Sequence, residues 1–384
     1  MEITTGQQKK EFDVIIAGGG LAGLALSIQL AKQGYRIAVL EKETYPFHKV
    51  CGEYISMESW DFLKTLRLDL EALNVSMITQ LQVSAENGKL LKQKLGLGGF
   101  GISRYLLDNE LVKIARSAGV IVEENTKVND ITFNDTEFTV AASQNNYTAK
   151  VVCGSYGKRS NMDIKWKRQF ATASRNKLNN YIGVKYHVRT DFADNTIALH
   201  NFKNGYCGIS KIEGDKYCLC YLTTADNLKK SQGLIHVMER TILSRNPYLK
   251  KILTESQILF ESPVTISQIS FDKKTQVENH VLMIGDAAGM ITPLCGNGMS
   301  MALHASKLAA AQIHSFLQGN ISRDEMEKKY TLLWQQQFAK RLRMGRRIQR
   351  LFGRSWVTNL FIATIKHFPG AVNYLIRQTH GKPF

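Results

Sequence analysis

Three glycines and one acid near the start of the chain have the types and the spacing that bind a dinucleotide. The glycines form the pattern Gly18-x-Gly20-x-x-Gly23, and Glu41 follows after roughly 20 residues. Gly18 allows a tight turn, Gly20 allows the backbone to approach a pyrophosphate, and Gly23 allows a helix to pack on a strand. A carboxylate at position 41 can accept from ribose hydroxyls, which suits FAD or NAD and disfavours a 2′-phosphate.

The elements that must position these residues lie on either side of the glycines. Residues 12–16 form a short apolar run, typical of a strand that is buried on both faces. An apolar helix follows the turn, so its free N–H groups and its dipole would point at the phosphates. Gly34 fits the left-handed position that ends a helix, and residues 35–40 predict a second strand. This context, more than the glycines themselves, predicts the dinucleotide site.

A second glycine pattern, Gly96-x-Gly98-x-x-Gly101, has the same spacing without the same context. The residues before it, 90–95 (LLKQKL), are not a buried β-branched run, and charged side chains crowd the start of the helix expected at 105–118. We interpret this pattern as an edge strand or a loop that leads into a helix, and not as a second nucleotide site.

The middle of the chain predicts many strands and few helices. A hairpin is expected over 75–95 around an Asn-Gly turn, helical spacing covers 60–73, and one helix is expected near 231–243. Further strand-like runs lie at 120–123, 127–133, 137–142, 147–153, 181–189, 196–202, 207–212 and 217–223. The later runs predict a mostly antiparallel sheet that forms the floor of a second domain.

After this region the pattern returns to a buried strand, an acid and a glycine-opened helix. The strand is expected at 280–284, and Asp286 directly after it could accept from ribityl hydroxyls. A long helix over 299–317 follows the glycines at 296 and 298. Its N-terminus is a second place in the chain that favours an anion.

Composition and length limit the remaining possibilities. A chain of 384 residues with 44% hydrophobic and 22% charged residues is expected to fold into two unequal globular domains. The six cysteines show no CxxC pair and no zinc spacing, so we expect no metal site. The sequence shows no apolar run of the roughly 20 residues that span a bilayer and no signal peptide, so we expect a cytoplasmic protein.

The positive charge is concentrated at the end of the chain. Residues 321–384 carry 13 Lys and Arg against 3 Asp and Glu, which is +10 of the net +17. No nucleic-acid-binding motif accompanies this charge, so a membrane surface or an acidic carrier protein fits better. Residues 338–365 contain an apolar stripe at near-helical spacing. The same segment carries seven basic residues: Lys340, Arg341, Arg343, Arg346, Arg347, Arg350 and Arg354. Such a stripe is expected either to bind a membrane surface peripherally or to pack on the protein core.

Three segments in this order resemble the flavoproteins of the p-hydroxybenzoate hydroxylase type (group A flavin monooxygenases). The segments are GGGLAG with Glu41, SRYLLDNEL from Ser103, and GDAAGMITPLCGNG. Within that superfamily the loop HKVCGE at 48–53 is similar to the KxCG loop of geranylgeranyl reductases. The resemblance implies an α/β fold. A discontinuous Rossmann-like FAD-binding domain would span 1–75, 102–165 and 265–330. An α+β substrate domain with a mostly antiparallel sheet would span 76–101 and 166–264. Basic amphipathic helices would follow over 331–384.

The resemblance also implies which residues hold FAD. The first glycines and Glu41 would hold the AMP half, Arg104 the phosphates or ribityl region, and Asp286 the ribityl or pyrophosphate part. The helix after Pro293 would direct its dipole at the N1–C2=O edge of the flavin. The full cofactor-binding set that we predict is Gly18, Gly20, Leu21, Ala22, Gly23, Glu41, Lys42, Arg104, Val128, Gly285, Asp286, Gly296, Asn297, Gly298 and Met299.

Departures from the family patterns leave the reaction open. The middle motif has Cys153-Gly154 where the superfamily usually has an Asp, and the aromatic strand that lines the prenyl cavity of geranylgeranyl reductases is not intact at 205–210. The WxWxIP pattern of flavin halogenases is absent, which argues against halogenation. We expect an FAD-dependent oxidoreductase that uses NAD(P)H on a hydrophobic or carrier-bound substrate, either a geranylgeranyl-reductase-like enzyme or a monooxygenase. A docking flavoprotein with structural FAD is the alternative of another class.

Candidate catalytic residues are few because the flavin itself carries the difficult chemistry. The resemblance places Cys51 near the isoalloxazine, where it could act or could be a small packing residue. His48 could donate to flavin or substrate, or could be an exposed loop histidine. Cys295 would have a depressed pKa if it were exposed beside the long helix, whereas packing in the core would prevent this.

Overall fold

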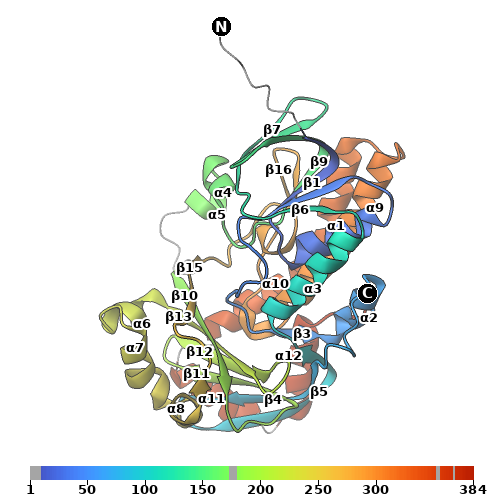
Figure 1. Ribbon diagram of the computed structural model, residues 1–384. Helices are drawn as coiled ribbons and strands as arrows, with labels where there is room; N and C mark the ends of the chain where they lie inside the picture. The colour runs from blue at the N-terminus through green and yellow to red at the C-terminus, as the bar shows by residue number, and fades with distance from the viewer. Residues whose placement is uncertain (1–9, 173–179, 352–354, 366–367) are drawn as a thin grey trace.

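The computed structural model describes residues 10–172, 180–351, 355–365 and 368–384. Two sheets organise the chain, one in the upper and one in the lower half of the view in Figure 1. Arg354, one of the seven basic residues of the C-terminal stripe, lies outside the described residues.

The first sheet is built mainly from parallel strands. Its strands are β1 (Lys10–Ala17), β2 (Ile37–Leu40), β6 (Ile121–Glu123), β7 (Val128–Phe133), β8 (Phe138–Ala142), β9 (Asn146–Gly154), β16 (Val277–Glu278) and β17 (Val281–Met283). The order is β16-β17-β9-β1-β2-β6, with β7 and β8 joined to β9 as an antiparallel branch. β1 pairs in parallel with both β2 and β9. Val14, Ile15 and Ile16 are fully buried, as the apolar run predicts for a central strand.

Three helices from distant parts of the sequence pack together beside this sheet. They are α1 (Leu21–Ala31), α3 (Arg104–Ser117) and α9 (Gly298–Leu317), and α1 contacts both of the others. α10 (Arg323–Leu351) packs along α9, and Figure 1 shows both beside the first sheet. The start of the chain and residues near 300 therefore form one structural unit, although all the strands of the second sheet lie between them in the sequence.

The second sheet is antiparallel apart from the β4–β11 pair. Its strands are β3 (Tyr54–Ser56), β4 (Ser76–Ser84), β5 (Leu90–Gly101), β10 (Tyr181–Arg189), β11 (Thr196–Phe202), β12 (Gly205–Lys211), β13 (Tyr217–Thr224), β14 (Gln257–Ile258) and β15 (Val264–Ile269). The order is β14-β10-β13-β12-β11-β4-β5-β3, with β15 also paired to β10. The α/β fold with a parallel-rich sheet and a mostly antiparallel second sheet is confirmed.

The second glycine pattern lies inside β5 and is not a nucleotide-binding turn. Gly99 and Gly101 permit close backbone approach instead, because a Cβ at position 99 would collide with the carbonyl of Ile55 and one at 101 with the carbonyl of Lys211. The strand leads into a helix, α3, as expected, but it is not an edge strand, because β5 pairs with β4 on one side and with β3 on the other.

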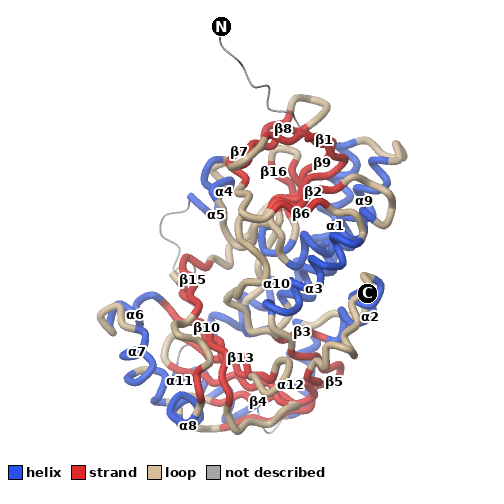
Figure 2. Tube along the Cα trace, in the orientation of Figure 1, coloured by secondary structure: helices blue, strands red, loops and turns tan. Residues whose placement is uncertain are grey.

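Two helix predictions were wrong in extent. Short helices α6 (Ala225–Lys230), α7 (Ile235–Thr241) and α8 (Pro247–Glu255) replace the single helix expected at 231–243, because Gly233 at φ +78° and the Asn246-Pro247 start divide the segment. The helix expected at 60–73 ends early as α2 (Trp60–Thr65), since Arg67 adopts a left-handed φ of +69°. Figure 2 shows α6 to α8 on one side of the second sheet.

Four further α-helices complete the described chain. They are α4 (Asn161–Lys165), α5 (Gln169–Thr172), α11 (Ser355–Ile365) and α12 (Pro369–Thr379). α11 and α12 pack against the second sheet, and the chain then runs back to α2, where Phe384 meets Phe62 at a ring distance of 5.3 Å (Figure 1). None of the helices in the described ranges is long and apolar enough to cross a membrane.

Candidate active site

The first glycine turn has the geometry that a pyrophosphate needs. Gly18 adopts φ +104°, and a Cβ at position 23 would collide with the carbonyl of Gly18. A Cβ at Gly20, in contrast, would meet no described protein atom closer than 3.6 Å. Within the described residues no side chain caps α1 and its first turn holds no acid, so its N–H groups remain available to an anion.

Glu41 lies beside this turn and is oriented by it. The carboxylate accepts from the backbone N–H of Gly19 at 2.8 Å and from that of Glu43 at 3.1 Å, and the residue is buried. Sequence reasoning missed Tyr45, whose hydroxyl donates to the carbonyl of Gly19. Lys42, also in the predicted set, lies in solvent and pairs with Glu43 at 2.9 Å. The buried carboxylate at the turn is placed as a ribose-binding acid requires.

Arg104 lies at the start of α3 within a buried group of charges. Its guanidinium donates to both carboxylate oxygens of Asp108, at 2.8 and 2.7 Å, and Lys49 pairs with the same carboxylate at 3.0 Å. Burial alone would raise the pKa of Asp108, but the charges of Arg104 and Lys49 hold it below its ordinary value. Arg104 also interacts electrostatically with Asp286, which places the second and third family segments close to each other.

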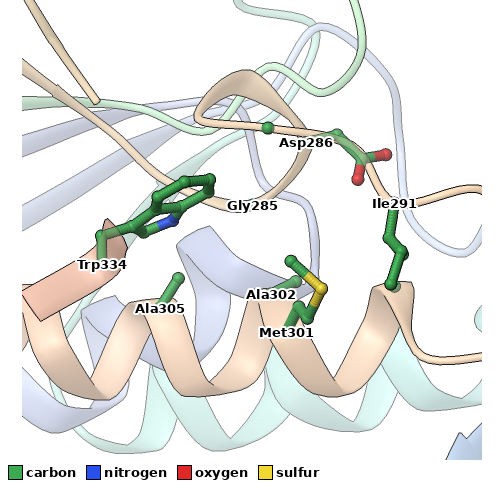
Figure 3. A pocket seen from close by; sticks show the side chains of 9 residues that line it. Gly285, Asp286, Ile291, Met301, Ala302, Ala305 and Trp334 are labelled. Carbon is green, nitrogen blue, oxygen red and sulfur yellow. The ribbon is translucent and has the colours of Figure 1, made fainter. Parts of the chain in front are cut away.

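The third family segment, GDAAGMITPLCGNG, packs against the first, GGGLAG. A Cβ at Gly285 would lie 3.2 Å from the Cβ of Ala22, so the strand end after β17 lies against the start of α1. Figure 3 shows Gly285, Asp286 and the side chains of α9 around a small cavity that Trp334 closes. This cavity of about 10 Å³ holds at most one water molecule, so it is not a substrate pocket.

Two lysines that sequence reasoning missed surround Asp286. Lys274 donates to the backbone carbonyls of Asp286 and Lys158, each at 2.7 Å. Burial lowers the pKa of both lysines to about 8. Burial raises the pKa of Asp286, although the positive charges of Lys274, Arg104 and Lys158 act to lower it. The surroundings of this acid are therefore rich in cations, which suits the phosphate region of a dinucleotide.

The N-terminus of α9 forms the other end of the site. Gly296 adopts φ +63° in the turn before the helix, next to Tyr54, and Asn297 is the residue that precedes the first turn. The first turn from Gly298 holds no acid and receives no side-chain cap from the described residues. The sulfur of Met299 lies 3.6 Å from the Cys51 sulfur, so the HKVCGE loop rests on this helix end.

Val128 completes the account of the predicted cofactor-binding residues. It opens β7, two residues beyond Thr126, whose backbone N–H donates to the carbonyl of Glu41 at 2.8 Å. The structure thus brings the glycine turn, Glu41, Arg104, Asp286 and the start of α9 together around α1, α3 and α9, whereas Val128 lies on β7 and the Lys42 side chain points into solvent.

The candidate catalytic side chains are less reactive than their positions suggest. Burial raises the pKa of the Cys51 thiol, so it is a protonated thiol at neutral pH. Cys295 is buried, and its pKa rises to about 11 instead of falling, since its thiol lies inside the core. His48 is half-buried between Tyr105 and Phe260 and is not the exposed loop histidine expected, and burial lowers its pKa to about 4.

These residues fit FAD. One open helix end lies beside a glycine cradle and a ribose-type acid, and the start of α9 lies close to it, because Gly285 approaches both Ala22 on α1 and Ala302 on α9. A flavin supplies hydride and electron transfer and carries negative charge at its N1–C2=O edge when reduced, and the N-terminus of α9 would stabilise that charge. Among the described residues no group of three or more His, Cys, Asp or Glu could hold a metal ion.

Fold and site together define an FAD-dependent oxidoreductase, a class in which the relatives of this chain include reductases, monooxygenases and halogenases. The chain belongs to the family described as FAD binding domain, whose sequence profile matches residues 11–343.

Individual relatives are distant. The chain is 26% identical over 373 residues to conditioned medium factor receptor 1 of Dictyostelium discoideum, with 87% of this chain and 69% of that protein covered. It is 21% identical over 343 residues to digeranylgeranylglycerophospholipid reductase of Methanococcus vannielii, with 86% and 84% covered. The structure of the flavin-dependent brominase Bmp2 superposes with a TM-score of 0.78 at 18% identity, covering 96% of this chain and 93% of that one, which shows the shared fold.

Proposed function

We propose that this chain is an NAD(P)H-dependent flavoprotein reductase that reduces a C=C bond of a hydrophobic or carrier-bound substrate. The observation that carries the proposal is an apolar cluster that joins the second sheet to the turn before α9. Its buried members are Tyr206, Leu222, Ile269, Phe271 and Leu294. Because α9 begins directly after this turn, apolar side chains surround the place where the reactive end of the flavin would lie, which suits an apolar substrate.

The residues of the chain would bind, orient and exclude water. The HKVCGE loop would cover the start of α9, where Cys51 contacts Met299 as a neutral thiol. The dipole of α9 would stabilise a reduced flavin, and Arg104 would hold the phosphate or ribityl region. The similarity of this loop to the reductase loop, together with Cys153 in place of the usual Asp, favours reduction over hydroxylation.

The oxygen dependence of turnover distinguishes a reductase from a monooxygenase and from a docking protein with structural FAD. NAD(P)H oxidation should be stimulated by an allylic or polyprenyl substrate equally well in aerobic and anaerobic buffer, with saturated product by mass spectrometry. Substrate-dependent oxygen consumption with a hydroxylated product would identify a monooxygenase instead. Flavin that NAD(P)H does not reduce, with no turnover in either buffer, would favour a docking protein with structural FAD.

We further propose that the C-terminal helices dock the protein on an anionic membrane surface. Part of the apolar stripe belongs to the core, because Phe338 and Leu342 are buried. Trp356 and Leu360 lie one turn apart on α11 and are 69% and 62% exposed, while Ile362 on the same helix packs against the second sheet. The net +10 of residues 321–384 complements anionic lipid headgroups.

Replacing both Trp356 and Leu360 by Ala should reduce partitioning onto phosphatidylserine-containing vesicles. Each buried apolar side chain contributes about 1.5–3 kcal/mol, so the partition coefficient should fall at least roughly tenfold in sedimentation assays. Leu332→Ala is the matched control, since Leu332 is 57% exposed but lies on α10 and not on α11. Equal sedimentation of wild type and the double variant would contradict membrane docking through α11.

A further inference from the structure

One strand of the second sheet presents charged side chains to the interior of the protein. On β10 the alternate residues Val184, Tyr186 and Val188 pack into the core of the second sheet. Lys185 and His187 point to the other face, yet they are 0% and 3% exposed. An ionised side chain without solvent is stable only when it is paired and hydrogen-bonded.

Both side chains meet the same carboxylate, that of Glu53 at the end of the HKVCGE loop. Lys185 Nζ lies 2.5 Å from Glu53 Oε1, and His187 Nε2 lies 2.7 Å from Glu53 Oε2. The backbone N–H of Arg104 donates to Glu53 Oε1 at 2.8 Å. One fully buried carboxylate therefore connects β10, the loop and the first residue of α3.

Further contacts hold the loop at its other end. Lys185 Nζ also donates to the carbonyl of Lys49 at 3.2 Å, and the thiol of Cys218, opposite His187 on β13, donates to the carbonyl of Cys51 at 3.2 Å. Burial would raise the pKa of Glu53, but the His187 hydrogen bond and the charge of Lys185 hold it below its ordinary value. The charged pair therefore persists at neutral pH.

We propose that Glu53, Lys185 and His187 form a clasp that positions Arg104 and the HKVCGE loop for the flavin. They are positioning residues, because the clasp acts through the backbone of Arg104 and through the loop that contacts Met299. The clasp thereby joins β10 of the second sheet to the loop and to the start of α3. This inference rests on the flavin site described above.

The test compares two double variants that both remove the charge pair. Glu53→Met with Lys185→Met replaces it by apolar side chains of similar size, a change that buried ion pairs often tolerate. It removes the acceptor for the Arg104 N–H, so we expect the FAD dissociation constant to rise about tenfold or more, with altered visible circular dichroism and midpoint potential of the bound flavin. Glu53→Gln with Lys185→Met keeps that acceptor and loses only the Lys185 contacts, including the bond to the Lys49 carbonyl, so its FAD dissociation constant should rise less than that of the Met/Met variant.

Control variants keep the outcome interpretable. Tyr186→Phe, which removes a hydrogen bond to Glu239 on the opposite face of β10, should leave FAD binding unchanged. If the Met/Met variant does not fold, His187→Phe serves in its place, since the new ring would pack beside His48 and Phe260, and its FAD dissociation constant should rise severalfold. A folded Met/Met variant, or a His187→Phe variant, with unchanged affinity and flavin spectra overturns the clasp. A wild-type protein that binds no FAD overturns the flavin site instead.

Discussion

Gly20→Val should abolish FAD retention. The space beside Gly20 is open, with no described protein atom within 3.6 Å of a Cβ at that position, and it faces the free N–H groups of α1. Two methyl groups there would exclude the pyrophosphate and break charge-assisted hydrogen bonds to it. Overpacking costs about 1–3 kcal/mol and each lost bond about 1.5–3 kcal/mol, so the dissociation constant should rise roughly 100-fold or more.

The second glycine pattern supplies the matched control for this substitution. A Cβ at Gly96 would meet no described atom within 4 Å, so valine fits there at least as easily as at Gly20, but Gly96 lies in β5, away from the helix end. Gly96→Val should therefore leave the flavin content of the purified protein unchanged. If both valine variants retain flavin equally, measured by absorbance after gel filtration, the first glycine turn does not bind the pyrophosphate.

Lys185→Met alone should strongly destabilise the protein. It leaves the Glu53 carboxylate fully buried without its cation, and removing one partner of a buried ion pair costs about 3–5 kcal/mol. The free energy of unfolding from urea titration should fall by about that amount. Tyr186→Phe on the same strand removes one of the two tyrosine hydroxyls that donate to Glu239 and should cost less, about 1.5–3 kcal/mol.

The pKa shifts of Glu53 and Lys185 determine the pH at which the urea titration should be made. The pKa of Glu53 is lowered, so its contribution to stability is present above its unfolded value near pH 4.3 and is lost as the pH falls through the folded value. The pKa of Lys185 is raised by Glu53 although burial opposes this, so its contribution is present below about pH 10.4 and is lost at higher pH. At pH 7 the full effect is measured, and a loss below about 1 kcal/mol would contradict a buried ion pair.

The parts of the fold that depend on local backbone geometry could be predicted from the sequence. The Gly18–Gly23 turn, the acid at Glu41 and the helix after Gly296 are each specified by residues that are close in the sequence, so residue spacing was sufficient to predict these elements. The longer strands were also recognisable, β1 from its continuous apolar run and most others from strand-like apolar patterns, whereas β3, β14, β15 and β16 were not predicted. The helices between 225 and 255 were not recognisable either, because their limits depend on single turn residues such as Gly233.

The clasp could not be predicted, because its signal is ambiguous along the sequence. Lys185 and His187 alternate with apolar residues as the solvent face of a strand does, and only the packing of the two sheets buries them. Glu53 stands in a loop whose resemblance drew attention to Cys51 instead. Likewise, the buried positions of His48 and Cys295 depend on residues far away in the sequence, such as Phe260 and Gly345.

Titration of the flavin-free protein with FAD and with FMN tests most directly whether the first glycine turn and Glu41 bind the AMP half of FAD. The first glycine turn and Glu41 are assigned to the AMP half of the cofactor, which FMN lacks. We expect FAD to bind with one site per chain, while FMN, measured by flavin fluorescence under the same conditions, binds far more weakly. Equal affinity for both flavins, or no binding of either one, would contradict this expectation.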